Sequence, residues 1–186
     1  VEGSERVVWQ TMSGVSDDLG DSGLHFYFGW TTTPHKYYTA SDTFILDDKV
    51  VSARNDYMSI REQAFNQPDA KPVIVPVQMD HLSTLDIKNG KTTGPTNITL
   101  ACVMQYHLVP EQLIQLHRDK TQSFRTTFIK EILINELIEQ STILDARTVY
   151  QGSGRVTLQK TIQKKLKTCE RFKKYGVAVE KFVIRE

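Results

Sequence analysis

The sequence predicts an α+β domain in which amphipathic helices pack on a sheet. The clearest observation lies in residues 155–185, where the hydrophobic period changes once, at Gly176. Before this glycine, apolar residues recur every three or four positions, as on one face of a helix; after it they alternate, as in a strand. Strands dominate the first half of the chain, helices follow, and the strand after Gly176 returns to the sheet. This order is typical of the α+β class.

Length and charge limit the functions open to the chain. Its 186 residues suit one domain with a sizeable core, and the net charge of +1 provides no overall field that would favour nucleic acid. No apolar run approaches the roughly 20 residues that span a bilayer. Cys102 on a strand and Cys169 on an apolar helix face indicate buried thiols and no disulfide. Because the chain begins with Val1, we expect it to be a piece of a longer protein.

The first element in chain order is a strand at residues 5–12. Residues 13–23 are rich in Gly, Ser and Asp, which predicts a turn-rich loop. Its aspartates suggest calcium, but Ser22 stands where an EF-hand requires glycine, and Phe28 stands where it requires the bidentate glutamate. We therefore expect a solvated loop.

Residues 23–48 are unusually aromatic and allow two interpretations. They could form a strand and hairpin whose rings enter the core, as aromatic residues commonly do. Alternatively, the first part is a loop that touches a membrane interface, where Tyr and Trp are favoured. The second interpretation makes four residues candidate membrane contacts: Phe26, Tyr27, Phe28 and Trp30.

The middle of the chain predicts a short helix beginning near Asp56 and a strand at 73–79, where Pro76 indicates an edge or a bulge. Asn89-Gly90 is a strong turn signal, so we expect a hairpin between residues 82–87 and 96–108. One face of its second strand is apolar and consists of Ile98, Leu100, Cys102, Met104, Tyr106 and Leu108.

Helices follow this hairpin. Pro110 suits the first position of a short helix at residues 110–119, and a longer helix is expected from about 121 to 140. A Gly-Ser-Gly hinge leads into the final helix, whose apolar face contains Leu158, Ile162, Leu166, Cys169 and Phe172.

The sequence contains no convincing catalytic or metal-binding constellation. The five histidines lack zinc-ligand spacing. Asp80-His81 beside Ser83 has the residue types of a hydrolase triad, but neighbours in a strand point to opposite faces. We therefore expect neither an enzyme nor a bound cofactor; an enzyme would need a cleft in which His81 or His107 meets a carboxylate.

The final helix has a marked charge bias. Between Arg155 and Lys174, eight lysines and arginines stand against Glu170 alone. Three explanations remain open: a solvated outer face, attraction to anionic lipid head groups, and pairing with an acidic face of a neighbouring subunit. The candidate lipid or subunit contacts are Lys160, Lys164, Lys165, Lys167 and Arg171.

Five short motifs, in order along nearly the whole chain, resemble the SPFH or band 7 domain of stomatins, prohibitins, flotillins and the HflK and HflC proteins. They are the opening VEGSERVV, the Gly23-Leu24-His25-Phe26 stretch, residues 82–86, residues 106–110, and the Tyr175-Gly176-Val177 junction with its strand. The residues that match the motifs most closely are Gly23, His25, Phe26, Thr84, Asp86, Pro110, Tyr175 and Gly176.

The resemblance implies a curved, mostly antiparallel sheet covered by helices. It makes residues 1–50 the membrane-proximal part and 51–186 the core, with an anchor before Val1 and a coiled coil after Glu186. It also implies a non-catalytic, membrane-associated scaffold: a homo- or hetero-oligomer of SPFH subunits that forms rings or cages, with lipids and membrane proteases or channels as partners. The alternative is a soluble module that encloses a small hydrophobic ligand among its aromatic rings. Asn97 lies in a glycosylation sequon, which matters only in a secretory lumen.

Overall fold

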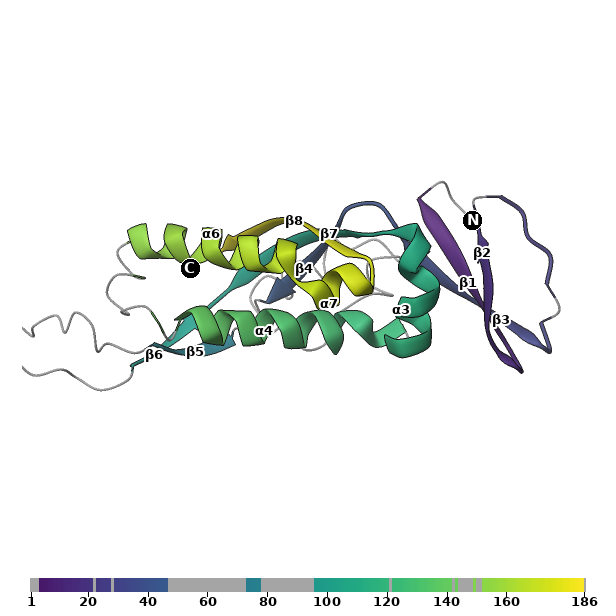
Figure 1. The fold of residues 1–186 in the computed structure, drawn as a ribbon, viewed down its shortest axis with the longest axis horizontal. Coiled ribbons are helices and arrows are strands. Elements are labelled where there is room, and N and C mark those ends of the chain that lie inside the picture. The colour runs from purple at the N-terminus through teal and green to yellow at the C-terminus, as the bar shows by residue number, and fades with distance from the viewer. Residues whose placement is uncertain are drawn as a thin grey trace, which may run out of the picture.

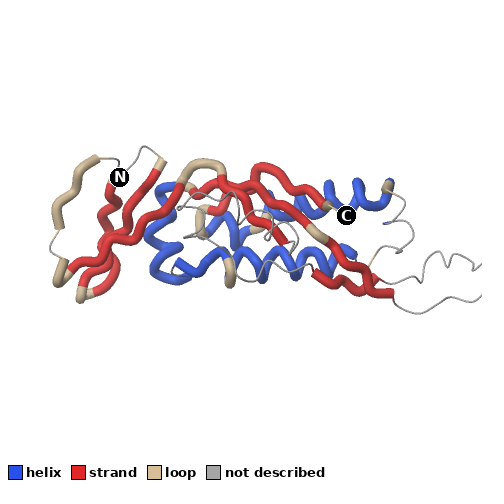
Figure 2. The backbone as a smooth tube through the Cα atoms, turned by 180° about the vertical axis from the view of Figure 1, so that it is seen from behind, coloured by secondary structure: helices blue, strands red, loops and turns tan. Residues whose placement is uncertain are grey.

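The computed structural model describes residues 4–21, 23–27, 29–46, 73–77, 96–120, 122–141, 143, 149 and 152–185. These residues form an α+β fold, as the sequence predicts, and every strand pairing among them is antiparallel. Helices lie on one side of the central strands, and the N-terminal sheet lies at one end of the molecule, beyond the helix α3 (Figure 1). The view from behind shows the strands in front of the helices (Figure 2).

The N-terminal sheet has the strand order β2-β1-β3 and consists of β1 (Glu5–Thr11), β2 (Gly14–Gly20) and β3 (Thr32–Tyr38). β1 confirms the first predicted strand. The turn-rich loop predicted for 13–23 is wrong for most of its length, because β2 occupies it. Its partly buried Val15 and Leu19 pack against the core, and pairing with β1 satisfies the backbone despite the Gly- and Asp-rich sequence.

The central sheet has the order β4-β7-β8 and consists of β4 (Asp42–Leu46), β7 (Cys102–Leu108) and β8 (Val177–Ile184). In β7 the predicted alternation is confirmed: Cys102, Met104, Tyr106 and Leu108 are buried, and Gln105 between them is exposed. β8 departs from simple alternation because its register against β7 shifts next to Glu180. This bulge brings Phe182 onto the buried face.

A two-stranded ribbon pairs β5 (Val73–Val77) with β6 (Thr96–Leu100), and Pro76 lies opposite Asn97. β5 confirms the predicted strand with proline at a position that a two-stranded ribbon tolerates. The hairpin prediction assigned a different partner to residues 96–100. That predicted partner, residues 82–87, and the helix expected near Asp56 lie outside the described residues.

The first helical region begins, as predicted, at Pro110: η1 (Pro110–Gln112) continues into α3 (Leu113–Lys120). The predicted helix at 121–140 starts later than expected, since η2 (Gln122–Arg125) precedes α4 (Phe128–Ser141).

The final helix is divided by Cys169, whose ψ of 116° ends α6 (Ser153–Thr168) before α7 (Glu170–Lys174) begins. In an uninterrupted helix Phe172 would lie about 120° around the axis from Leu166. The break redirects the chain, and Phe172 packs edge-to-face on Phe128, with 5.8 Å between the ring centroids.

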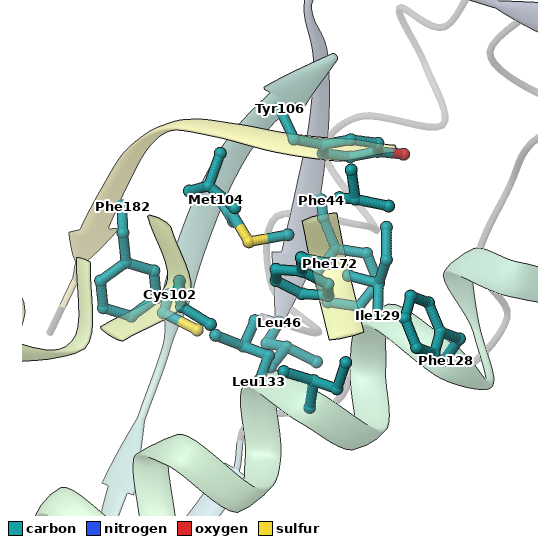
Figure 3. Packing of buried hydrophobic residues seen from close by; sticks show 14 of the residues in the cluster. Phe44, Leu46, Cys102, Met104, Tyr106, Phe128, Ile129, Leu133, Phe172 and Phe182 are labelled. Carbon is teal, nitrogen blue, oxygen red and sulfur yellow. The ribbon is translucent and has the colours of Figure 1, made fainter. Parts of the chain in front are cut away.

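The core lies between the central sheet and the helices (Figure 3). Strand residues such as Phe44, Met104 and Phe182 meet Leu133 from α4 and Phe172 from α7, and all five are fully buried. Covering each such side chain contributes about 1.5–3 kcal/mol to folding. Cys102 is also buried within this core, as predicted, and Cys169 is partly buried against it; both are free thiols.

Candidate functional site

Large apolar side chains gather on the surface at the outer end of the N-terminal sheet. Phe26 is 90% exposed, Trp30 89%, Met12 84% and Leu24 83%. Tyr27, at 51%, is half exposed. We call these five residues the apolar tip. They lie in the β1–β2 turn and in the segment that connects β2 to β3, at the right-hand end of Figure 1.

The apolar tip is supported from beneath by the N-terminal sheet. The Met12 amide donates a hydrogen bond of 3.2 Å to the Thr31 carbonyl, which ties the β1–β2 turn to the end of the connecting segment. The indole of Trp9 lies 5.5 Å from the Tyr27 ring and 5.9 Å from the His25 imidazole, measured between centroids. The sheet therefore holds the connecting segment while the outer rings remain in solvent.

This arrangement bears on the interpretation that the aromatic rings enter the core. The hairpin interpretation, in which the aromatic rings enter the core, is wrong for Phe26 and Trp30, although Tyr37 further along is buried. β3 and β4 also belong to different sheets. Phe28 lies outside the described residues. Sequence reasoning missed Met12 and Leu24 as exposed apolar residues. The available signal was that each of these apolar residues stands beside a stretch rich in glycine and serine, which favours an exposed turn.

The predicted basic helix separates into two groups of side chains. Lys165 bonds to Glu139 at 2.5 Å and lies 3.7 Å from Glu136. Its pKa is raised, first by the hydrogen bond to Glu139. Arg171 pairs with Glu131 at 3.1 Å. These two cations therefore bind α4 of the same chain.

The other three candidates form what we call the lysine stripe: Lys160, Lys164 and Lys167. They are exposed, and their spacing along α6 places them on one face. Within the described part of the chain they make no ion pair.

A polar cluster on the central sheet joins a serine, a glutamate and a histidine. Ser41 donates to one carboxylate oxygen of Glu180 at 2.7 Å, and His107 Nδ1 lies 2.8 Å from the other. The hydrogen bond from Ser41, followed by that from His107, holds the pKa of Glu180 below its usual value. Because the hydroxyl donates to the carboxylate and not to the imidazole, it lacks the base that activates a nucleophile.

This cluster contains the histidine–carboxylate pair that an enzyme would need, but the two side chains are 42% and 40% exposed on a sheet surface. No group of three or more potential metal ligands occurs among the described residues. His81 lies outside them.

A cavity of about 170 Å³ lies between α4 and α6 and is lined by Gln140, Ile143, Thr157, Leu158 and Thr161. None of the aromatic candidates is among these residues. The alternative of a ligand-binding module requires aromatic rings that point into a cavity, and Phe26 and Trp30 are almost fully exposed.

Two of the motifs behind the family resemblance meet in space. The Val109 amide, just before Pro110, donates to the Gly176 carbonyl at 2.8 Å. Tyr175 packs edge-to-face on Phe128, with 5.0 Å between centroids. Gly23 and His25 belong to the segment that carries the apolar tip, whereas Thr84 and Asp86 lie outside the described residues.

No known protein family matches the chain by its family model, and no curated protein resembles it significantly in sequence. Of the helices that the structure describes, none is both long enough and apolar enough to cross a bilayer.

Proposed function

We propose that this chain is a non-catalytic, membrane-associated scaffold domain of the band 7 type, which touches the bilayer through the apolar tip. The observation that carries the proposal is the exposure of Phe26, Trp30, Met12 and Leu24 at one end of the molecule. Large exposed apolar surfaces on a folded domain mark sites of contact with a protein, a ligand or a membrane. Aromatic residues at such a surface suit the membrane interface in particular.

The magnitude of the effect is sufficient for binding. An aromatic side chain removes about 150–250 Å² from water when covered, and each Å² contributes about 25 cal/mol. Half-covering the two most exposed rings would then contribute about 4–6 kcal/mol before the entropic cost of association. Two nearby carboxylates are neutralised by ion pairs: Asp17 of β2 pairs with Arg118, and Asp21, which follows β2, pairs with Arg6.

The assembly part of the proposal rests on the family resemblance. In this view the domain forms homo- or hetero-oligomeric rings or cages of SPFH subunits on the membrane, organises membrane microdomains and restrains membrane proteases or channels. The lysine stripe is the surface available for lipid head groups or an acidic face of the next subunit, because Lys165 and Arg171 are already paired within the chain.

The membrane contact can be tested with vesicles of neutral phospholipid. We expect the wild-type chain to sediment with them and the double variant Phe26→Ser, Trp30→Ser to lose about 100-fold or more in partition, as the estimated energies imply. The matched control is Ile143→Ser, Val156→Ser, which removes the exposed apolar side chains of α6 and of the segment after α4. This control should bind like the wild type. Equal partition of all three proteins would refute membrane contact by the apolar tip.

A further inference from the structure

The N-terminal sheet meets the helical body at α3, and a buried hydrogen bond crosses this joint. The Tyr37 hydroxyl of β3 and Nδ1 of His117 in α3 are 2.6 Å apart, and His117 is only 5% exposed. Burial raises the pKa of Tyr37 well above its usual value, so the hydroxyl keeps its proton and donates it to Nδ1. This direction corresponds to the His117 tautomer whose Nδ1 carries no proton, whereas in the other tautomer Nδ1–H would donate to the hydroxyl oxygen.

A second imidazole lies against the first. The ring of His35, also from β3, has its centroid 4.4 Å from that of His117, with 36° between the planes. Its Nε2 lies 3.0 Å from Oε1 of Gln10 on β1, to which it donates. One strand thus contributes both the hydroxyl that binds His117 and the imidazole that stacks on it.

The surroundings disfavour a proton on His117. Burial lowers its pKa, and the neighbouring His35 lowers it further. From η2, Phe124 packs near Tyr37 with 6.1 Å between centroids and brings no charge.

Most charged residues of the packed strands and of α3 have partners of their own, whereas Asp18 of β2 and Asp119 of α3 make no ion pair within the described part of the chain. From β2, Asp17 is bound to Arg118 at 3.0 Å, and on β1 Arg6 pairs with Asp21 and Glu5 with Lys36. Lys120 of α3 lies over the Phe128 and Tyr175 rings.

We propose that His35 and His117 form a proton-operated latch, which holds the N-terminal sheet on α3 at neutral pH and loosens that joint when the two imidazoles become protonated. A proton on Nδ1 of His117 turns this acceptor into a donor, so the Tyr37 hydroxyl must accept, and its own proton loses this acceptor at a buried position. Because the two rings are stacked at 4.4 Å, positive charge on both imidazoles would be repulsive. Because this joint positions the apolar tip, acid would release the tip from its fixed orientation on the body.

The direction of the pH effect follows from linkage. The pKa of His117 is lowered where the ring is buried in the closed joint. In a state with the joint open, where the ring is in water, His117 therefore binds a proton more readily as the pH falls. The closed joint is fully favoured above the ordinary histidine pKa. It is lost progressively as the pH decreases from there towards the lowered folded-state pKa.

Hydrogen exchange of the full chain, expressed as protection factors that correct for the intrinsic pH dependence, tests the latch. Between about pH 7.5 and pH 5, on either side of the usual histidine pKa, we expect protection of Thr32–Tyr38 to fall at least about tenfold relative to Phe128–Ser141. The variant His35→Phe keeps a stacked ring without a charge and should lose most of this acid response. His107→Gln, which removes an exposed histidine on the central sheet, should keep the whole response.

Three outcomes would overturn the latch: constant protection of β3 in the wild type across this pH range, an undiminished response in His35→Phe, or a lost response in His107→Gln. The proposal does not depend on membrane binding, because the measurement contains no lipid.

Discussion

Gly176 joins α7 to β8, and replacing it with alanine is the most sharply defined perturbation of this fold. Its φ of +68° lies in the left-handed region, which costs a residue with a Cβ about 1–2 kcal/mol. The added Cβ would also lie 2.7 Å from Cβ of Gln112 and 3.2 Å from the Val109 carbonyl oxygen. Since the Gln112 contact is at the root of its side chain, a rotamer change cannot relieve it, and the backbone must move.

The two effects together predict a loss of about 2–5 kcal/mol, from about 1–2 for the left-handed conformation and a further 1–3 for overpacking. This is a large part of the 5–15 kcal/mol typical of a domain. Urea unfolding followed by intrinsic fluorescence measures the difference, with the m-value compared to confirm that the unfolding transition is the same.

Two other glycines separate conformational strain from steric overlap. Gly152 has a φ of +90° and a ψ of −38° but no atom within 4 Å of an added Cβ, so Gly152→Ala should show backbone strain alone, about 1–3 kcal/mol. Gly29 has neither feature, and Gly29→Ala should change stability by no more than about 0.5 kcal/mol. If Gly176→Ala costs only about 1–2 kcal/mol, the cost of the left-handed conformation, the argument from close packing against Gln112 is wrong.

Two further predictions address the core and the lysine stripe. Phe172→Ala removes a fully buried ring and should lower the free energy of unfolding by about 3–5 kcal/mol. Phe26→Ala removes a ring that is 90% exposed and should change the free energy of unfolding by less than about 0.5 kcal/mol. Similar losses in both variants would contradict the assigned packing. The triple variant Lys160→Glu, Lys164→Glu, Lys167→Glu should weaken binding to anionic vesicles at low salt by about 1 kcal/mol or more per lysine, with the difference shrinking at high salt. Lys165→Glu is the comparison, because this lysine is paired within the chain; unchanged binding by the triple variant would identify the stripe as a solvated face.

Much of the candidate site could be predicted from local sequence, and its limits have a physical cause. The aromatic segment was identifiable from composition, but composition does not state whether a ring enters a core or remains in solvent. That depended on where β3 and β4 pair, and they pair in different sheets. Likewise, the sequence shows the charge bias of the final helix but not which of its cations form ion pairs. Lys165 and Arg171 do so because α4 packs beside them and contributes Glu139 and Glu131.

The polar cluster and the latch were beyond sequence reasoning. Ser41 and Glu180 are 139 positions apart, and Tyr37 and His117 are 80 apart. Separations of this size leave no local period to detect. The shift of apolar residues in β8, from Val177 and Val179 to Phe182 and Ile184, was nevertheless a readable sign of the bulge at Glu180.

By itself, the sequence determined the α+β class, the helix–glycine–strand unit around Gly176 and the buried face of β7, because each depends on a short-range period or on a single residue's conformational freedom. The tertiary structure alone decided that β2 is a strand, that the final helix breaks at Cys169, and that the apolar tip stays in solvent. These features depend on contacts between distant segments: a strand partner supplied by β1, a pocket for Phe172 beside Phe128, and a sheet that supports Trp9 and Tyr27 while leaving Phe26 and Trp30 uncovered.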